Sequence, residues 1–165
     1  MFRLSMVVLL AALMATTSVA AETRIGVVDL RQALFSSKDA REFSAQMQQD
    51  FSGEEAKVRE AQEAARKLQE RLEKDGAMMN ESERNKITAE FQEKVKEFNF
   101  LKQRLDSTVA SRKQQFLEDA RPEVDAAVKE LLDEHDLDII LPSEAVVYVK
   151  PDMNLTEELL EKLDR

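Results

Sequence analysis

Apolar residues recur every three to four positions through one long stretch of the chain, residues 38–120. A strand would require a repeat of two, so this spacing predicts helix. The repeat skips a step where Glu54, Lys102 and Lys113 occupy positions expected for apolar residues. Its members are Ala40, Phe43, Met47, Phe51, Val58, Ala61, Ala65, Leu68 and Leu72 in the first half, and Ile87, Phe91, Val95, Phe98, Leu105, Val109, Phe116 and Ala120 in the second.

Residues 74–80 divide this stretch into two halves. Each half contains more than thirty residues and no proline, so each helix would be roughly 50 Å long. Long helices gain most of their stability by packing an apolar face, which predicts an antiparallel helical hairpin. Gly76 suits the left-handed conformation that ends a helix, and Asn80 with Glu83 predicts a capping box at the start of the next one.

Short apolar segments before and after the hairpin predict strands. Residues 24–30 form an apolar, β-branched run typical of a buried strand, and a short helix over 31–35 leads into the first arm. The second and third strands are expected at 137–141 and 145–149, paired with each other through the turn at 142–144.

The C-terminal part also contains helix signals. Arg121 and Pro122 predict a kink or a new helix start, because proline is tolerated in the first turn but removes a hydrogen bond further in. Thr156 is expected to act as the N-cap of a final helix.

The predicted fold class is therefore α+β and mostly α: a helical-hairpin arm, 38–120, protruding from a small β body formed by 21–37 and 121–165. Three short strands leave sheet edges open, and a two-helix arm is too narrow to bury both apolar faces, so oligomerisation is expected to complete the body. Hinges are expected where the chain passes between arm and body, at Ser36, Ser37, Arg121 and Pro122. The residues predicted to contact other subunits are Ile25, Val27, Val28, Ile139, Ile140, Val146, Val147 and Tyr148.

The first twenty residues predict export. Arg3 precedes an apolar run that is too short for a membrane span, and small residues follow it up to Ala20. This arrangement is typical of a cleavable signal peptide with cleavage after Ala20. The chain has no cysteine, so its stability after export must come from packing and assembly rather than from disulfides.

The charge is distributed unevenly. The chain carries a net charge of −9, and residues 118–165 contain 15 acidic and five basic side chains. Nucleic acid is not an expected partner, since phosphate binding depends on concentrated positive charge. The second arm helix is mildly basic, and a solvated face balanced by intrahelical ion pairs explains this better than a binding stripe does.

The sequence does not support catalysis. His135, the single histidine, lies among acidic residues near a predicted helix C-terminus, where the helix dipole favours a cation. One histidine and no cysteine provide no convincing metal or thiol site. The three glycines are far apart and form no phosphate-binding loop. We therefore expect no enzyme activity, no metal and no cofactor.

The order of elements and four local strings resemble the OmpH-like family of periplasmic chaperones. The strings are IGVVDL at 25–30, HDLDIIL at 135–141, AVVYV at 145–149 and LTEEL at 155–159. The resemblance implies a homotrimer with a shared β body and three helical arms around a cavity, where unfolded outer-membrane proteins are held without ATP. The best-known member of the family is strongly basic. The acidic charge of this chain disfavours direct binding to lipopolysaccharide or to a membrane.

Client contacts are expected where apolar side chains lie off the helix-pairing stripe. Phe100 lies about 200° around the helix from Phe98, so it faces either a client or a neighbouring subunit. Met78 and Met79, at the tip, either touch clients or cap the hairpin. The alternative function is a periplasmic coiled-coil spacer or adaptor that binds one folded partner through sealed apolar stripes.

Overall fold

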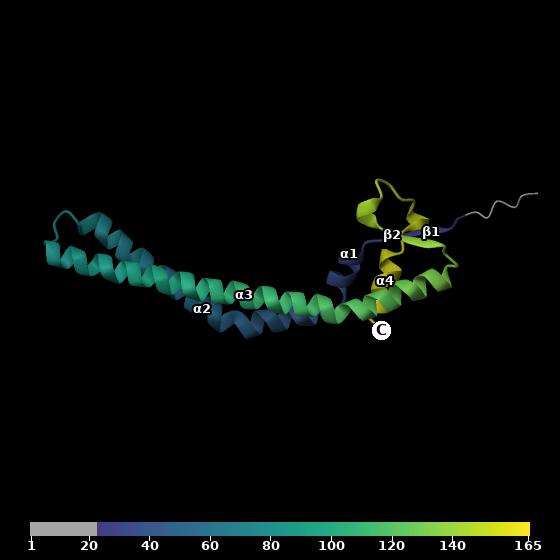
Figure 1. The fold of residues 1–165 in the computed structure, drawn as a ribbon, viewed down its shortest axis with the longest axis horizontal. Coiled ribbons are helices and arrows are strands. Elements are labelled where there is room, and N and C mark those ends of the chain that lie inside the picture. Colours follow the sequence, from purple (N-terminus) through teal and green to yellow (C-terminus); the bar gives the residue numbers. More distant parts are fainter. Residues whose placement is uncertain (1–22) are drawn as a thin grey trace, which may run out of the picture.

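The computed structural model describes residues 23–165. The predicted signal peptide and the cleavage point after Ala20 lie outside these residues. Most of the described chain is helical, and one long hairpin extends from a small body, as Figure 1 shows.

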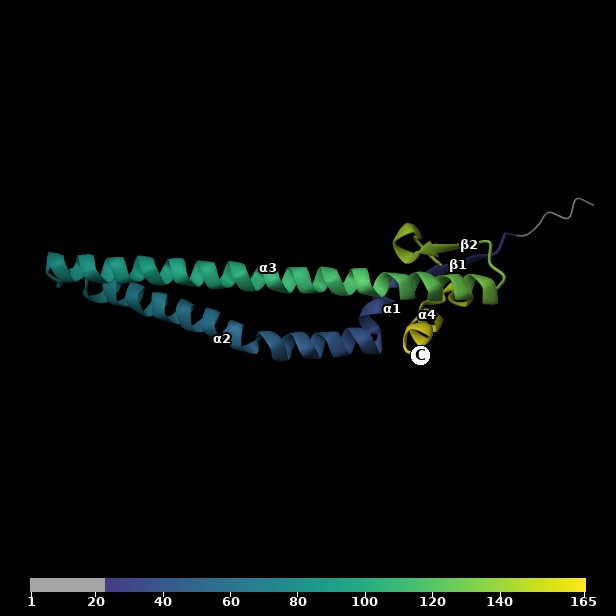
Figure 2. The same ribbon diagram turned by 60° about the horizontal axis from the view of Figure 1, so that its bottom comes forward.

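The hairpin consists of α2 (Lys38–Asp75) and α3 (Glu81–Glu134), which lie side by side in both views of the ribbon (Figures 1 and 2). Ala61 and Ala65 of α2 and Ile87 of α3 are buried along the seam. Near the body the rings of Phe43 and Phe116 stack with their centroids 4.5 Å apart. The predicted antiparallel arm is therefore confirmed.

At the tip of the hairpin, the predicted cap at the start of α3 is confirmed and the predicted conformation at the end of α2 is wrong. The Asn80 side chain accepts a hydrogen bond from the Glu83 backbone N–H at 2.9 Å, as an N-cap does. Gly76, however, is right-handed, with φ −56°. The left-handed helix end predicted there is wrong, because the turn closes through hydrogen bonds from Met78 and Met79 to the Asp75 carbonyl.

Helix α3 runs through Pro122 as one element, so of the two alternatives predicted at Arg121 and Pro122, a kink or a new helix start, the new start is wrong. Proline inside a helix removes one hydrogen bond and costs about 3 kcal/mol. Packing of the following turns against the body offsets that cost, since Ala127 and Leu131 are buried there. The division into arm and body stays a prediction. Helix α3 continues across the predicted boundary between residues 120 and 121.

The sheet has two parallel strands, β1 (Ile25–Val28) and β2 (Ile139–Pro142), with Ile25 opposite Ile139. The third strand predicted at 145–149 is wrong, and so is its hairpin with β2. Pro142 ends β2, and the 3-10 turn η2 (Ser143–Ala145) then carries the chain out of the sheet. The following residues, 146–150, form no strand within the described chain.

The end of α3 directs the chain into β2. Asp136 takes a left-handed φ of 49°, the Leu137 N–H bonds to the Leu132 carbonyl at 2.9 Å, and the Asp136 N–H bonds to the Asp133 carbonyl at 3.4 Å. These two bonds form a Schellman motif. Arg24, just before β1, forms an exposed ion pair of 2.5 Å with Asp136.

The core of the body lies between α1 (Leu30–Ser36), the last turns of α3, and α4 (Thr156–Leu163). Thr156 is the first residue of α4 and not its N-cap, which corrects the prediction. Its backbone N–H donates to Asn154 Oδ1 at 3.1 Å, while its hydroxyl accepts from the Asp29 N–H at 2.9 Å. The buried members of this core are Val28, Ala33, Ala127, Leu131, Leu155, Leu159 and Leu163.

Candidate functional site

The arm presents apolar side chains to solvent away from its helix-pairing seam. Phe100 is 64% exposed and borders a shallow hollow of about 280 Å³ with Gln103, Arg104 and Ser107. Met78 at the tip is 82% exposed, whereas Met79 is half-buried. Phe100 and Met78 therefore stand free within one chain, and Met79 contributes partly to closing the turn.

The residues predicted to mediate oligomerisation fall into two groups. Val27 and Val28 are buried inside their own chain, and Ile25, Ile140 and Val146 are half-buried. Ile139, Val147 and Tyr148 are exposed, with Tyr148 at 80% and Val147 fully open to solvent. The exposed group lies on β2 and on the segment that follows η2.

The predicted hinge residues differ in how firmly they are held. Ser37 is buried, donates its hydroxyl to the Leu34 carbonyl at 2.7 Å and caps α2 by accepting from the Ala40 N–H at 3.2 Å. Arg121 makes only a long ion pair of 3.9 Å with Asp125. Hinge motion at these positions stays a prediction.

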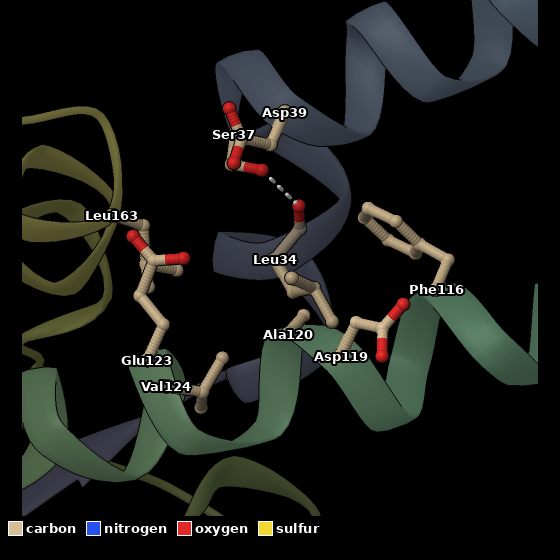
Figure 3. Close-up of a pocket in the computed structure, with 9 residues that line it drawn as sticks. All are labelled: Leu34, Ser37, Asp39, Phe116, Asp119, Ala120, Glu123, Val124 and Leu163. Atoms are coloured by element: carbon tan, nitrogen blue, oxygen red, sulfur yellow. Dashed lines mark hydrogen bonds between the residues drawn. The ribbon is translucent and has the colours of Figure 1, made fainter.

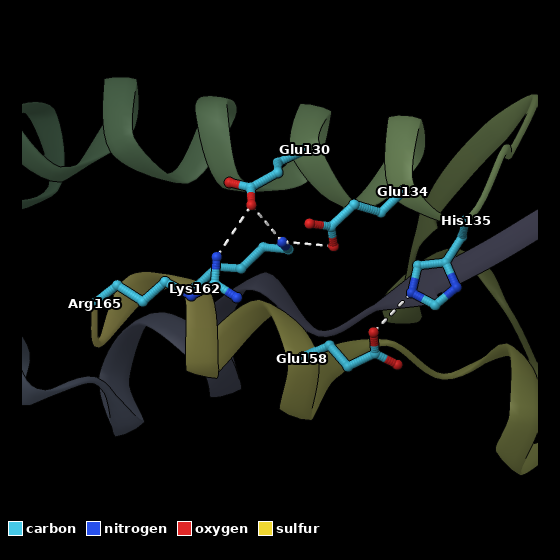
Figure 4. Close-up of polar contacts among 6 residues, drawn as sticks. All are labelled: Glu130, Glu134, His135, Glu158, Lys162 and Arg165. Atoms are coloured by element: carbon cyan, nitrogen blue, oxygen red, sulfur yellow. Dashed lines mark hydrogen bonds and ion pairs between the residues drawn. The ribbon is translucent and has the colours of Figure 1, made fainter.

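A charged cluster fastens α4 to α3. Lys162 has a side chain only 4% exposed, and its ammonium lies 2.7 Å from carboxylate oxygens of both Glu130 and Glu134 (Figure 4). Arg165 adds a contact of 3.2 Å to Glu130. The buried ammonium is therefore fully paired, as a buried charge must be.

The same contacts shift two acid–base equilibria. The hydrogen bond from Lys162 lowers the pKa of Glu130 below its ordinary value of 4.5. The reciprocal bond to Glu130 and a second to Glu134 raise the pKa of Lys162 above 10.5. Both shifts favour the ionised pair.

His135 caps the end of α3, and its Nε2 lies 2.7 Å from a carboxylate oxygen of Glu158 on α4. The contact is shown in Figure 4. It makes His135 a second link between the two helices. The arrangement agrees with the structural role expected near a helix C-terminus.

A hollow of about 190 Å³ lies where the arm meets the body, and Figure 3 shows the side chains around it. Its apolar floor includes Leu34, and the carboxylates of Asp39, Asp119 and Glu123 surround it; none of the three forms an ion pair with another described residue. Sequence reasoning missed this hollow because it lies between the junction of α1 and α2, the interior of α3 and the end of α4, which are brought together only by folding.

Within residues 23–165, no group of three or more potential ligand side chains is arranged to hold a metal ion. No helix of this part of the chain is both long enough and apolar enough to span a membrane.

A small body that supports one long helical arm with exposed apolar side chains has the form of a binding scaffold. The family model described as outer membrane protein (OmpH-like) matches residues 24–163. This chain belongs to the OmpH-like family, a family of periplasmic chaperones and not of enzymes. The family resemblance expected from the sequence is confirmed.

Two curated relatives match nearly the whole chain. A Skp-like protein of Pseudomonas aeruginosa is 28% identical over 96% of this chain and 95% of its own. The chaperone protein Skp of Vibrio cholerae is 27% identical over 97% of this chain and 94% of its own. A crystal structure of an OmpH-like outer membrane chaperone from Caulobacter crescentus superposes with a TM-score of 0.62 at 17% identity, covering 87% of this chain and 85% of the other. This likeness supports the fold.

Proposed function

We propose that this protein is an ATP-independent periplasmic holdase that binds unfolded outer-membrane proteins and prevents their aggregation. The observation that carries the proposal is the exposure of Phe100 on an arm whose seam residues are buried or half-buried. A holdase needs apolar surface that stays available to unlike clients, and Phe and Met provide large or adaptable contacts. Membership in a family of outer-membrane chaperones supports the same function.

The client-binding form is proposed to be a homotrimer whose arms enclose a cavity. Ile139, Val147 and Tyr148 support this, because a single chain leaves them open to solvent and Ile139 lies on β2, which has a free edge. An unpaired edge with apolar neighbours favours pairing with another chain. Export through the signal peptide, with cleavage after Ala20, would deliver the mature chain to the periplasm.

The test uses the chain beginning at Ala21. A denatured outer-membrane β-barrel protein is diluted from urea without nucleotide, and its aggregation is followed by light scattering. Near-stoichiometric trimer is expected to suppress the aggregation. Phe100→Ser is expected to suppress it less, because the variant loses about 1.5–3 kcal/mol of binding free energy from the burial of one large apolar side chain.

Gln103→Ser is the matched control, since Gln103 lines the same hollow on the same helix without presenting an apolar surface. If the folded, oligomeric protein fails to suppress aggregation, the holdase proposal is wrong. The coiled-coil spacer then becomes the better function, and it predicts binding to one native partner instead. Equal suppression of aggregation by both variants would show that Phe100 does not contact clients, and it would not contradict the holdase function.

A further inference from the structure

A second apolar groove lies at the root of the arm, apart from Phe100 and from the tip. The end of α1, the first turns of α2 and the facing part of α3 form its walls. Its volume is about 290 Å³, close to the lower limit of the ~300–1,000 Å³ typical of ligand pockets. The lining residues are Phe35, Ala40, Phe43, Ser44, Lys113, Phe116 and Leu117.

The groove is built from aromatic surface that the chain itself leaves uncovered. Phe43 and Phe116 stack and form the inner wall. Phe35, at the mouth, is 57% exposed, and Leu117 is also exposed. Placing three phenylalanines and a leucine around an open groove is costly in water, so an apolar occupant is favoured.

Lys113 is the single charged residue that lines the groove. Within residues 23–165 no carboxylate lies within ion-pair distance of its ammonium, although several other lysines and arginines of α3 have such a partner. Its position also breaks the apolar repeat of the sequence. The groove therefore combines apolar walls with one free positive charge.

We infer that this groove binds the C-terminal residue of an unfolded client, with its apolar or aromatic side chain against Phe43 and Phe116 and its α-carboxylate paired with Lys113. A chain end is the place where a polypeptide carries an anion and a large apolar group on one residue. The inference rests on the proposed holdase function. It assigns to the root of the arm a defined anchor, in addition to the diffuse contacts along the arm.

The inference is tested by titrating the full mature protein with an octapeptide of glycine and serine that ends in phenylalanine. Binding is followed by NMR chemical-shift changes at the backbone amides of α3 around Phe116. The free-acid peptide is expected to bind roughly three- to tenfold more tightly than the same peptide amidated at its C-terminus, as loss of one charge-assisted contact predicts. A peptide ending in serine should bind more weakly than either.

Lys113→Gln is expected to abolish the difference between acid and amide. Lys96→Gln makes the same charge change on the same helix at an exposed position away from the groove, and should preserve it. Equal binding of acid and amide by the unaltered protein, or equal behaviour of the two variants, would overturn the assignment. So would displacement of the peptide by dodecanoate at equal concentration, because the groove would then favour a fatty acid over a chain end.

Aggregation of the denatured β-barrel protein is measured on the same samples. If the protein suppresses aggregation but binds the acid and amide peptides equally, the proposed C-terminus site in the groove is wrong and the holdase function stands. If the protein binds the acid peptide more tightly but does not suppress aggregation, the groove binds a chain end and the holdase function is wrong. The two proposals can therefore fail separately.

Discussion

At the scale of single residues, close packing in the body leaves no room for a side chain at Gly26 on β1. A Cβ placed there would lie 2.8 Å from Leu137 Cδ1 and 2.9 Å from Leu155 Cδ1. Both contacts are with side-chain ends, which can shift, but Leu155 belongs to the buried core and has little space to move into. Glycine at this position thus permits close approach of the segment before α4 to the sheet.

Gly26→Ala is expected to destabilise the protein by about 1–3 kcal/mol, the usual cost of overpacking a core. Urea unfolding followed by circular dichroism measures the change in free energy. Gly53→Ala is the control, because a Cβ at Gly53 on α2 would meet nothing within 4 Å, and alanine there should stabilise by up to ~1 kcal/mol. An unchanged urea midpoint for Gly26→Ala would show that the two leucines move freely.

At the scale of elements, α4 is held to α3 by apolar burial and by the ionised cluster around Lys162. The pKa of Glu130 is lowered in the folded state, so its contribution to stability is present above the ordinary pKa of 4.5 and is lost as the pH falls through the folded value. The raised pKa of Lys162 means that its contribution is present below 10.5 and is lost as the pH rises through the folded value. Between pH 4.5 and pH 10.5, the contribution of the Glu130–Lys162 pair to the stability of the α3–α4 contact should therefore not change with pH.

The unaltered protein is therefore expected to lose more thermal stability than Lys162→Met when the pH falls from about 5 to about 3. The variant lacks the ammonium that lowers the pKa of Glu130, so it has less stability to lose in acid. Melting temperatures at several pH values measure the difference. Lys129→Met is the control, because Lys129 makes an exposed ion pair with Asp133 on the same helix. Parallel pH profiles for the unaltered protein and Lys162→Met would contradict the prediction.

At the scale of the whole molecule, a single chain exposes large apolar side chains on its body at Val147 and Tyr148. The described body buries a small core under a sheet of two strands, while Val147 and Tyr148 stand open on the segment that leaves the sheet. Burying one such side chain stabilises an interface by about 1.5–3 kcal/mol. The arm, in contrast, already has its Phe43–Phe116 contact and its buried alanines.

If the protein forms the proposed trimer through this segment, serine at both Val147 and Tyr148 is expected to shift it from trimer to monomer at micromolar concentration. Sedimentation equilibrium measures the mass, and circular dichroism should show that the helices are retained. Phe100→Ser on the arm should keep the mass of the unaltered protein. A double variant that is still trimeric would place the subunit contacts elsewhere in the body.

The sequence by itself determined the arm. The three-to-four-residue spacing of apolar positions is a local signal that survives whatever the chain packs against, so the hairpin and the exposure of Phe100 both follow from helical phase. The cap at Asn80 was predictable for the same reason, because side chain and N–H lie three residues apart. The course of α3 through Pro122 was not, since it depends on packing by residues of α4.

Only the tertiary structure decided the arrangement of the body. Ile25 and Ile139 pair across more than a hundred residues of chain, and no local pattern specifies whether such strands are parallel. Residues 145–149 have strong β-propensity, yet within the described chain they pair with no strand, because η2 carries the chain away from β2 directly after Pro142. The groove at Phe35 and Lys113 was hidden from the sequence for the same physical reason: three separate helices must meet before its walls exist.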